Sequence, residues 1–117
     1  MATFVLLYSG GRMPAGEAET KKVMDAWGAW MGKHQNAIVD AGNPFTPVAK
    51  TITTDGTVTD GPVGEHASGY TIIKADTMDR AIDIAKGCPV FLGGAKLSLY
   101  ETFDVMAMAG GQAGHEH

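Results

Sequence analysis

His34 is the histidine whose surroundings most favour proton transfer. It follows Trp30 by one helical turn, on a stripe of apolar residues that recur at three- and four-residue steps. An imidazole exchanges protons near neutral pH, so a His34 that faces a cleft between a helix and a sheet can act as a general acid or base. The alternative is a partly buried histidine that bonds a carbonyl oxygen and serves only the fold.

A glycine-bearing loop over residues 59–66 contains a second set of ionisable side chains, Asp60, Glu65 and His66. Loops held against a rigid sheet often carry binding sites. Because the glycines let the backbone pass close to a ligand, these three side chains can converge on the mouth of one pocket. In the alternative, Asp60 opens a Gly-Pro turn by bonding its own backbone, and the loop is a solvated connection.

Three aromatic residues and one acid complete the candidates for a ligand site. Trp27, Trp30 and Tyr70 can line a pocket for a flat apolar ligand, although aromatic residues at helical spacing also occur as plain core. Glu101 shares an alternating strand face with Leu99. If that face points inward, the carboxylate is desolvated and becomes a candidate for proton transfer, whereas an edge position leaves it in water.

Metal and cofactor motifs are missing from the sequence. The single cysteine, Cys88, excludes an intramolecular disulfide and a four-cysteine zinc site. His115 and His117 flank Glu116 and either clip a metal weakly or simply end a polar tail. No glycine-rich phosphate-binding motif and no nucleophile elbow occurs. We therefore expect no metal and no cofactor.

Composition narrows the class of protein further. The 117 residues are 44% hydrophobic and 19% charged, as in an ordinary globular domain, and the net charge is −4. The chain has no run of Lys or Arg that would mark a nucleic-acid surface. The longest apolar run, residues 4–8, is far shorter than the roughly 20 residues of a membrane span. We expect a cytoplasmic protein that contacts neither nucleic acid nor membrane.

Hydrophobic periodicity and turn residues predict the elements that must position these side chains. Thr20 is expected to cap a long first helix, and Gly42 to end it. Asp55-Gly56 is a strong hairpin signal, and Asp76 or Thr77 is expected to cap a second helix. The predicted segments are strands over 4–8, 48–54, 57–59, 68–75 and 96–103, helices over about 20–41 and 76–87, a single domain over 1–104 and a flexible tail over 105–117.

The order of elements predicts an α+β fold of the ferredoxin-like, split βαβ type. The predicted order β-α-β-β-β-α-β places both helices on one face of an antiparallel sheet. The predicted strands carry apolar residues on both faces, so the second face of the sheet is left with an apolar surface. Such surfaces usually mark interfaces, and we expect a homodimer built on this face.

Several short motifs resemble the YCII-related family, in particular its DGPF branch. They are TDGP at 59–62, SGYTIIKAD at 68–76, CP at 88–89 and GG at 93–94, and the resemblance covers roughly residues 3–103. It implies a ferredoxin-like fold that dimerises through its sheets into an α/β barrel. Where the branch usually has phenylalanine after DGP, this chain has Val63.

The resemblance also implies candidate chemistry. Family members resemble small lyases or isomerases, such as those that remove chloride from aromatic ring-cleavage intermediates, and they use a His–Asp pair. The aspartate carries over to Asp40, but Met31 occupies the family's histidine position and His34 lies one turn further on. His34 and Asp40 are therefore the catalytic candidates.

Two functional hypotheses follow. In the first, the protein is a homodimeric small-molecule-binding protein with a cleft between the first helix and the sheet. In the alternative, it is a cofactor-independent acid/base lyase or isomerase, dehydrochlorinase-like, that acts on a small cyclic or aromatic acid. The loss of the family histidine favours the first hypothesis.

Overall fold

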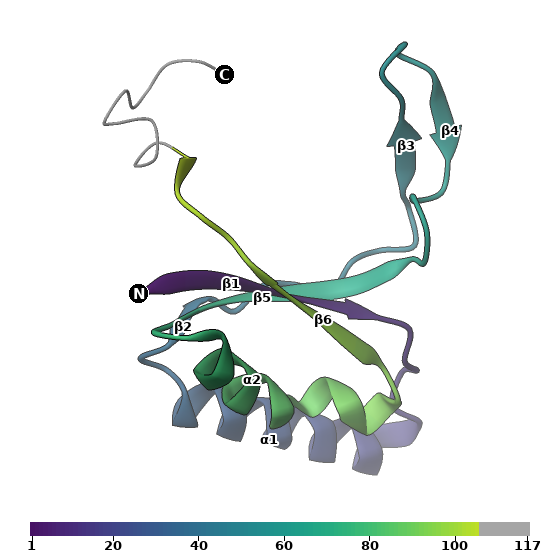
Figure 1. Ribbon diagram of the computed structural model, residues 1–117. Helices are drawn as coiled ribbons and strands as arrows, with labels where there is room; N and C mark the ends of the chain where they lie inside the picture. The colour runs from purple at the N-terminus through teal and green to yellow at the C-terminus, as the bar shows by residue number, and fades with distance from the viewer. Residues whose placement is uncertain (106–117) are drawn as a thin grey trace.

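The computed structural model describes residues 1–105 and shows an α+β fold (Figure 1), as predicted. The elements are β1 (Ala2–Ser9), α1 (Gly16–Lys33), β2 (Ile38–Asp40), β3 (Lys50–Ile52), β4 (Val58–Asp60), β5 (Ala67–Ala75), α2 (Met78–Lys86), the 3₁₀ helix η1 (Pro89–Gly93) and β6 (Lys96–Glu101). The predicted tail, with His115 and His117, lies outside the described residues apart from its first position.

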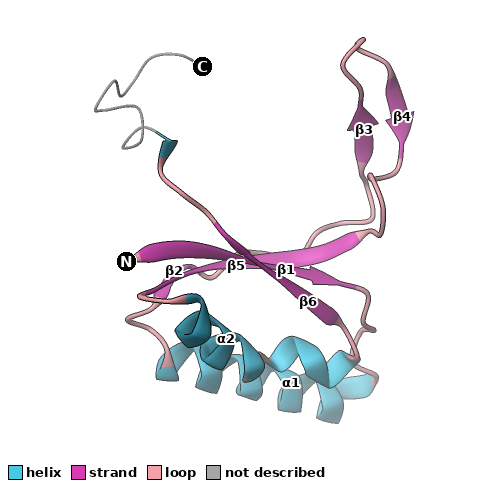
Figure 2. Ribbon diagram, viewed as in Figure 1, coloured by secondary structure: helices cyan, strands magenta, loops and turns pink. Residues whose placement is uncertain are grey.

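The main sheet has the strand order β2-β5-β1-β6, and all neighbouring strands are antiparallel. The unit β1-α1-β2 interleaves with β5-α2-β6, which is the split βαβ arrangement that the sequence predicts. Both helices cover the same face of this sheet (Figure 2). Neither of them combines the length and the hydropathy that a membrane-spanning helix needs.

The core lies between the sheet and the two helices. Phe4, Leu6 and Tyr8 alternate along β1 and are buried, because every second residue of a strand points to the same face. Trp30 of α1 is also buried, and its indole Nε1 donates a hydrogen bond to the Ile84 carbonyl of α2 at 3.0 Å. This bond ties the helical layer together at its centre.

No helix of residues 1–105 covers the opposite face of the sheet (Figure 2). On this face Val5 is paired with Ile72 of β5 and with Tyr100 of β6, and Leu7 is paired with Tyr70. These five residues, which we call the open face, form a continuous apolar patch across three strands. Tyr100 is 56% exposed, because β6 lies at the edge of the sheet.

The first helix begins and ends earlier than predicted. It begins at Gly16, and Thr20 lies one turn further on, where its hydroxyl donates to the Gly16 carbonyl. It ends at Lys33, and the His34 carbonyl then accepts hydrogen bonds from the amides of Ala37 and Ile38 in a tight turn.

The end of the predicted helix is instead the short strand β2. Ile38 pairs with Ile73 of β5, and the Lys74 amide donates to the Ala37 carbonyl. The apolar spacing of residues 34–41 fits a helix, but pairing with the buried strand β5 prevails over this local preference. The observed order thus contains one strand more than the predicted order.

The predicted hairpin forms, but it stays outside the main sheet. Strands β3 and β4 pair only with each other, around the Asp55-Gly56 turn, and project away from the sheet (Figure 1). The second helix agrees with prediction, because Thr77 caps it by accepting a hydrogen bond from the Arg80 amide at 3.1 Å.

Candidate functional site

A pocket of about 500 Å³ lies between α1 and one edge of the sheet. We call it the α1 pocket. Its walls are α1, the end of β1 with the loop that follows, the segment after β2, the start of β5, and η1. The side chains larger than proline that line it are Tyr8, Arg12, Met13, Glu19, Val23, Met24, Trp27, Met31, Asn43, Phe45, Tyr70, Thr71, Val90 and Leu92.

The helix supplies an apolar wall. Val23, Trp27 and Met31 follow one another at four-residue steps, so they lie on one face of α1. The Trp27 ring meets the Tyr8 ring edge to face, with centroids 6.0 Å apart. Met24 lies beside this row and is 65% exposed, so it borders the opening.

The opposite wall depends on the sharp turn after β2. Gly42 has φ of 78°, and a Cβ atom at this position would lie 1.6 Å from the carbonyl oxygen of Tyr70. The chain then follows the start of β5, where the Phe45 amide donates to the Ser68 carbonyl at 2.8 Å. The Phe45 ring stacks on that of Tyr70 at 5.7 Å.

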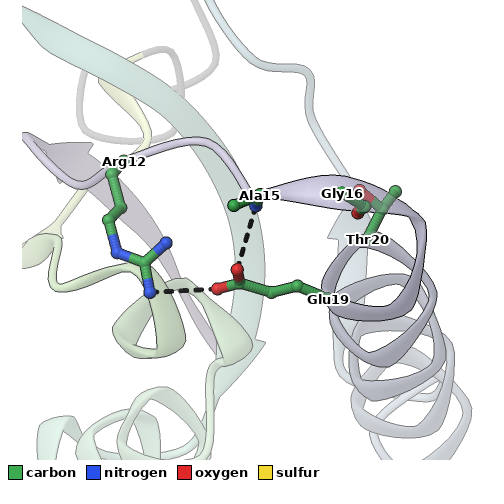
Figure 3. Close-up of polar contacts among 5 residues, drawn as sticks. All are labelled: Arg12, Ala15, Gly16, Glu19 and Thr20. Carbon is green, nitrogen blue, oxygen red and sulfur yellow. Dashed lines mark hydrogen bonds and ion pairs between the residues drawn. The ribbon is translucent and has the colours of Figure 1, made fainter.

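An ion pair closes one side of the α1 pocket (Figure 3). Arg12 Nη2 lies 3.0 Å from Glu19 Oε2, and Glu19 Oε1 accepts a hydrogen bond from the Ala15 amide at 2.9 Å. The Ala15 amide bond and, next, the Arg12 guanidinium hold the pKa of Glu19 below its usual value. Glu19 thus ties the loop after β1 to the first turn of α1, and its charge is balanced locally.

A chain of hydrogen bonds links Tyr8, Thr71 and Ala41, which line the α1 pocket, to the buried Cys88, which does not. The Cys88 thiol donates to the Tyr8 hydroxyl at 3.5 Å, Tyr8 donates to the Thr71 hydroxyl at 2.7 Å, and Thr71 donates to the Ala41 carbonyl at 2.9 Å. Burial raises the pKa of Tyr8 well above its usual value, and burial raises the pKa of the Cys88 thiol. Both groups are therefore neutral at physiological pH.

The lining suits an apolar, uncharged ligand. Among the described residues that line the α1 pocket, the groups charged at neutral pH are Arg12 and Glu19, which pair with each other. Neither His34 nor His66, the two histidines in the described part of the chain, lines it. No cluster of three or more His, Cys, Asp or Glu side chains in the described part of the chain could hold a metal ion.

The structure separates the two catalytic candidates. Asp40 ends β2, and its carboxylate accepts hydrogen bonds from the Gly42 amide at 2.8 Å and from the Tyr70 hydroxyl at 3.5 Å. Tyr70 belongs to the open face, whereas His34 lies in the helical layer at the end of α1. The sheet thus lies between His34 and Asp40, and one protomer does not bring them together as an acid/base pair.

The predicted aromatic candidates divide between two places. Trp27 and Tyr70 line the α1 pocket. Trp30 and His34 instead line a groove on the outside of the helical layer, between α1 and α2. The two tryptophan rings meet edge to face with centroids 5.8 Å apart, so the α1 pocket and this groove are neighbouring sites.

The three ionisable residues of the 59–66 loop do not share one pocket mouth. Asp60 pairs with Lys50 across the hairpin, and Glu65 lies 3.6 Å from Lys96. The His66 ring nitrogens face the carbonyl oxygens of Ala67 and Pro47, at 2.7 and 3.2 Å. Their separate partners favour the interpretation of this loop as a connection.

Glu101 occupies the edge position, the second of its two predicted alternatives. It pairs with Phe4 on the helix-covered side of the sheet, but it ends β6 and is exposed. Its carboxylate is therefore in contact with water.

Two features of the α1 pocket escaped the sequence analysis. The first is Met31, which lines the pocket one turn beyond the predicted Trp27, and the four-residue spacing is a signal for it. The second is the ion pair of Arg12 and Glu19, for which the sequence contains no signal, because the contact depends on the path of the loop between the two residues.

Comparisons with known proteins find similarity among solved structures. No protein-family model matches the chain, and no curated protein matches it significantly. Among solved structures, 5-chloro-2-hydroxyhydroquinone dehydrochlorinase from Burkholderia phenoliruptrix AC1100, in complex with 2,5-dihydroxybenzoquinone, is similar at 19% identity and a TM-score of 0.49, over 86% of this chain and 93% of that chain. A similarity of this degree assigns no activity, and membership of the YCII-related family stays a prediction.

Proposed function

We propose that the protein binds a compact, uncharged aromatic molecule in the α1 pocket. The observation that carries this proposal is the lining, in which an apolar wall from α1 faces an aromatic edge of the sheet and the two charged residues neutralise each other. A volume of about 500 Å³ accepts one or two rings, which is within the usual range for small-molecule sites.

The aromatic side chains support a flat ligand. Trp27 presents its ring to the α1 pocket from the helix, and Phe45 with its stacked partner Tyr70 borders the opposite side. Rings gain from edge-to-face and offset contacts beyond the area that they bury. The Asn43 amide at the same edge can orient a hydroxyl or carbonyl group of the ligand.

The same lining is the reason that we propose binding and not an acid/base lyase or isomerase. General acid/base catalysis needs a group that exchanges protons near the working pH. Tyr8 is held neutral by burial, Glu19 is held ionised by its partners, and His34 and Asp40 do not line the α1 pocket.

Met24→Asp tests the proposed site. The substitution places a carboxylate at the opening, and a ligand that covers it must remove water from a charge. We expect calorimetry to show indole binding to the wild-type protein and at least about fivefold weaker binding to the variant. Indole-3-carboxylate should bind the wild-type α1 pocket less well than indole does.

Met78→Asp is the matched control, because Met78 is a partly exposed methionine on α2 that does not line the α1 pocket. It should leave indole affinity unchanged. Equal weakening by both variants, or no binding of indole to the wild-type protein at millimolar concentration, would contradict the proposal.

We also propose that the protein is a homodimer formed through the open face. Val5, Leu7 and Ile72 lie side by side on adjoining strands there, on the face that α1 and α2 do not cover. Covering an apolar sheet face of this kind with a second copy removes it from water.

A further inference from the structure

The groove between α1 and α2 is a second concave surface, separate in character from the α1 pocket. It measures about 680 Å³ and is bounded by the last two turns of α1, by α2 and by η1. The buried ring of Trp30 lines it. Gly87, just after α2, packs close to this ring: a Cβ atom added to Gly87 would lie 3.6 Å from Trp30 Cδ1.

Positive charge gathers on this groove. It is lined by three basic side chains, Lys33 of α1 and Arg80 and Lys86 of α2, and by His34. Only one carboxylate among the described residues, that of Asp83, lines it. None of these five side chains takes part in an ion pair within the described part of the chain. In a protein with a net charge of −4, this is a local excess of uncompensated cations.

The positive charge and the exposed apolar side chains lie at different ends of the groove. The two helices run in opposite directions below the sheet, so that the end of α1 lies beside the start of α2 and η1 lies beside the earlier part of α1 (Figure 1). Lys33, His34 and Arg80 thus mark one end. Phe91 and Leu92, which are 45% and 47% exposed, mark the other.

We propose that this groove binds a small organic anion. Its carboxylate or phosphate lies among Lys33, His34 and Arg80, and its apolar body lies over Trp30 towards Phe91. The pattern requires both parts of the ligand: the charged group to pair with the cations, and the apolar body to cover exposed side chains that water now solvates. The proposal does not depend on the function of the α1 pocket.

His34 reports on this site. Its partial burial first, and then the charges of Lys33 and Arg80, hold its pKa below the usual value. The other ionisable groups that line the groove are Asp83 and Lys86 of α2 and the buried Cys88 before η1. A bound anion offsets the two neighbouring cations, so binding must raise the pKa of His34 and take up protons.

An NMR titration of the full chain tests this directly. The pKa of His34 is measured from its ring-proton shifts, alone and with phenyl phosphate, benzoate, inorganic phosphate or benzyl alcohol. We expect phenyl phosphate and benzoate to raise it by about 0.5 or more at saturation, and benzyl alcohol to leave it unchanged. His66, which does not line the groove, should not respond to any of the four.

Two variants locate the effect. Arg80→Gln should raise the pKa of His34 in the free protein and weaken phenyl phosphate binding about fivefold. Lys22→Gln removes an exposed lysine of α1 that does not line the groove, and it should change neither quantity. An unchanged His34 pKa with both organic anions would overturn the proposal. Equal affinity for inorganic phosphate and phenyl phosphate would overturn its organic part.

Discussion

Replacing Gly42 by alanine is expected to lower the free energy of unfolding by about 3 kcal/mol or more. The residue has φ of 78°, which disfavours any side chain, and the added Cβ would lie 1.6 Å from the Tyr70 carbonyl oxygen. That oxygen belongs to β5, a strand held on both sides by β1 and β2, so it cannot move away. Urea denaturation of the two proteins measures the difference.

The α1 pocket should be lost with the turn. Because Gly42 leads the chain from β2 to the segment that contains Asn43 and Phe45, a displaced turn removes one wall. Gly56→Ala is the matched control, since Gly56 has φ of 87° but open space around it, and it should cost only about 1 kcal/mol. Similar losses from the two substitutions would show that the contact with Tyr70 does not constrain the fold.

Leu7→Lys is expected to convert a homodimer into a monomer. Leu7 lies at the centre of the open face, between Tyr70 on β5 and Ser98 on β6, and a lysine there would place a charge inside the proposed interface. Sedimentation at micromolar concentration should give twice the 12.2 kDa of one chain for the wild-type protein, and 12.2 kDa for the variant.

Met78→Lys makes a comparable change on α2, in the helical layer on the other side of the sheet, and should leave the dimer intact. Circular dichroism should show that both variants keep the wild-type secondary structure. A wild-type protein that sediments as a 12.2 kDa species, or a Leu7→Lys variant that remains dimeric, would exclude the open face as the interface.

Local signals predicted most of the fold because they agree with tertiary structure here. Thr77 caps α2 as its type and position indicate, and the predicted strands over 4–8 and 68–75 lie within β1 and β5. The exception is β2. Its three residues continue the helical spacing of α1, and only their pairing with β5 makes them a strand, which no local pattern encodes.

The candidate site was predictable only in part, for the same reason. Trp27 was identified because an aromatic residue on an amphipathic helix faces the sheet. The separation of His34 from Asp40 followed from the early end of α1, which turns the chain back into the sheet and moves Asp40 to its other side. The cations of the groove come from two helices that are distant in sequence, so no run of charge marks them.

The most direct test of the central claim is an NMR titration with indole that follows the two tryptophan indole N–H signals. Trp27 lines the α1 pocket and Trp30 lines the groove, so each signal reports mainly on one site. We predict a saturable shift of the Trp27 signal, larger than that of Trp30, together with shifts of the Met24 and Met31 methyl groups. No saturable shift of Trp27, or a larger shift of Trp30, would contradict ligand binding in the α1 pocket.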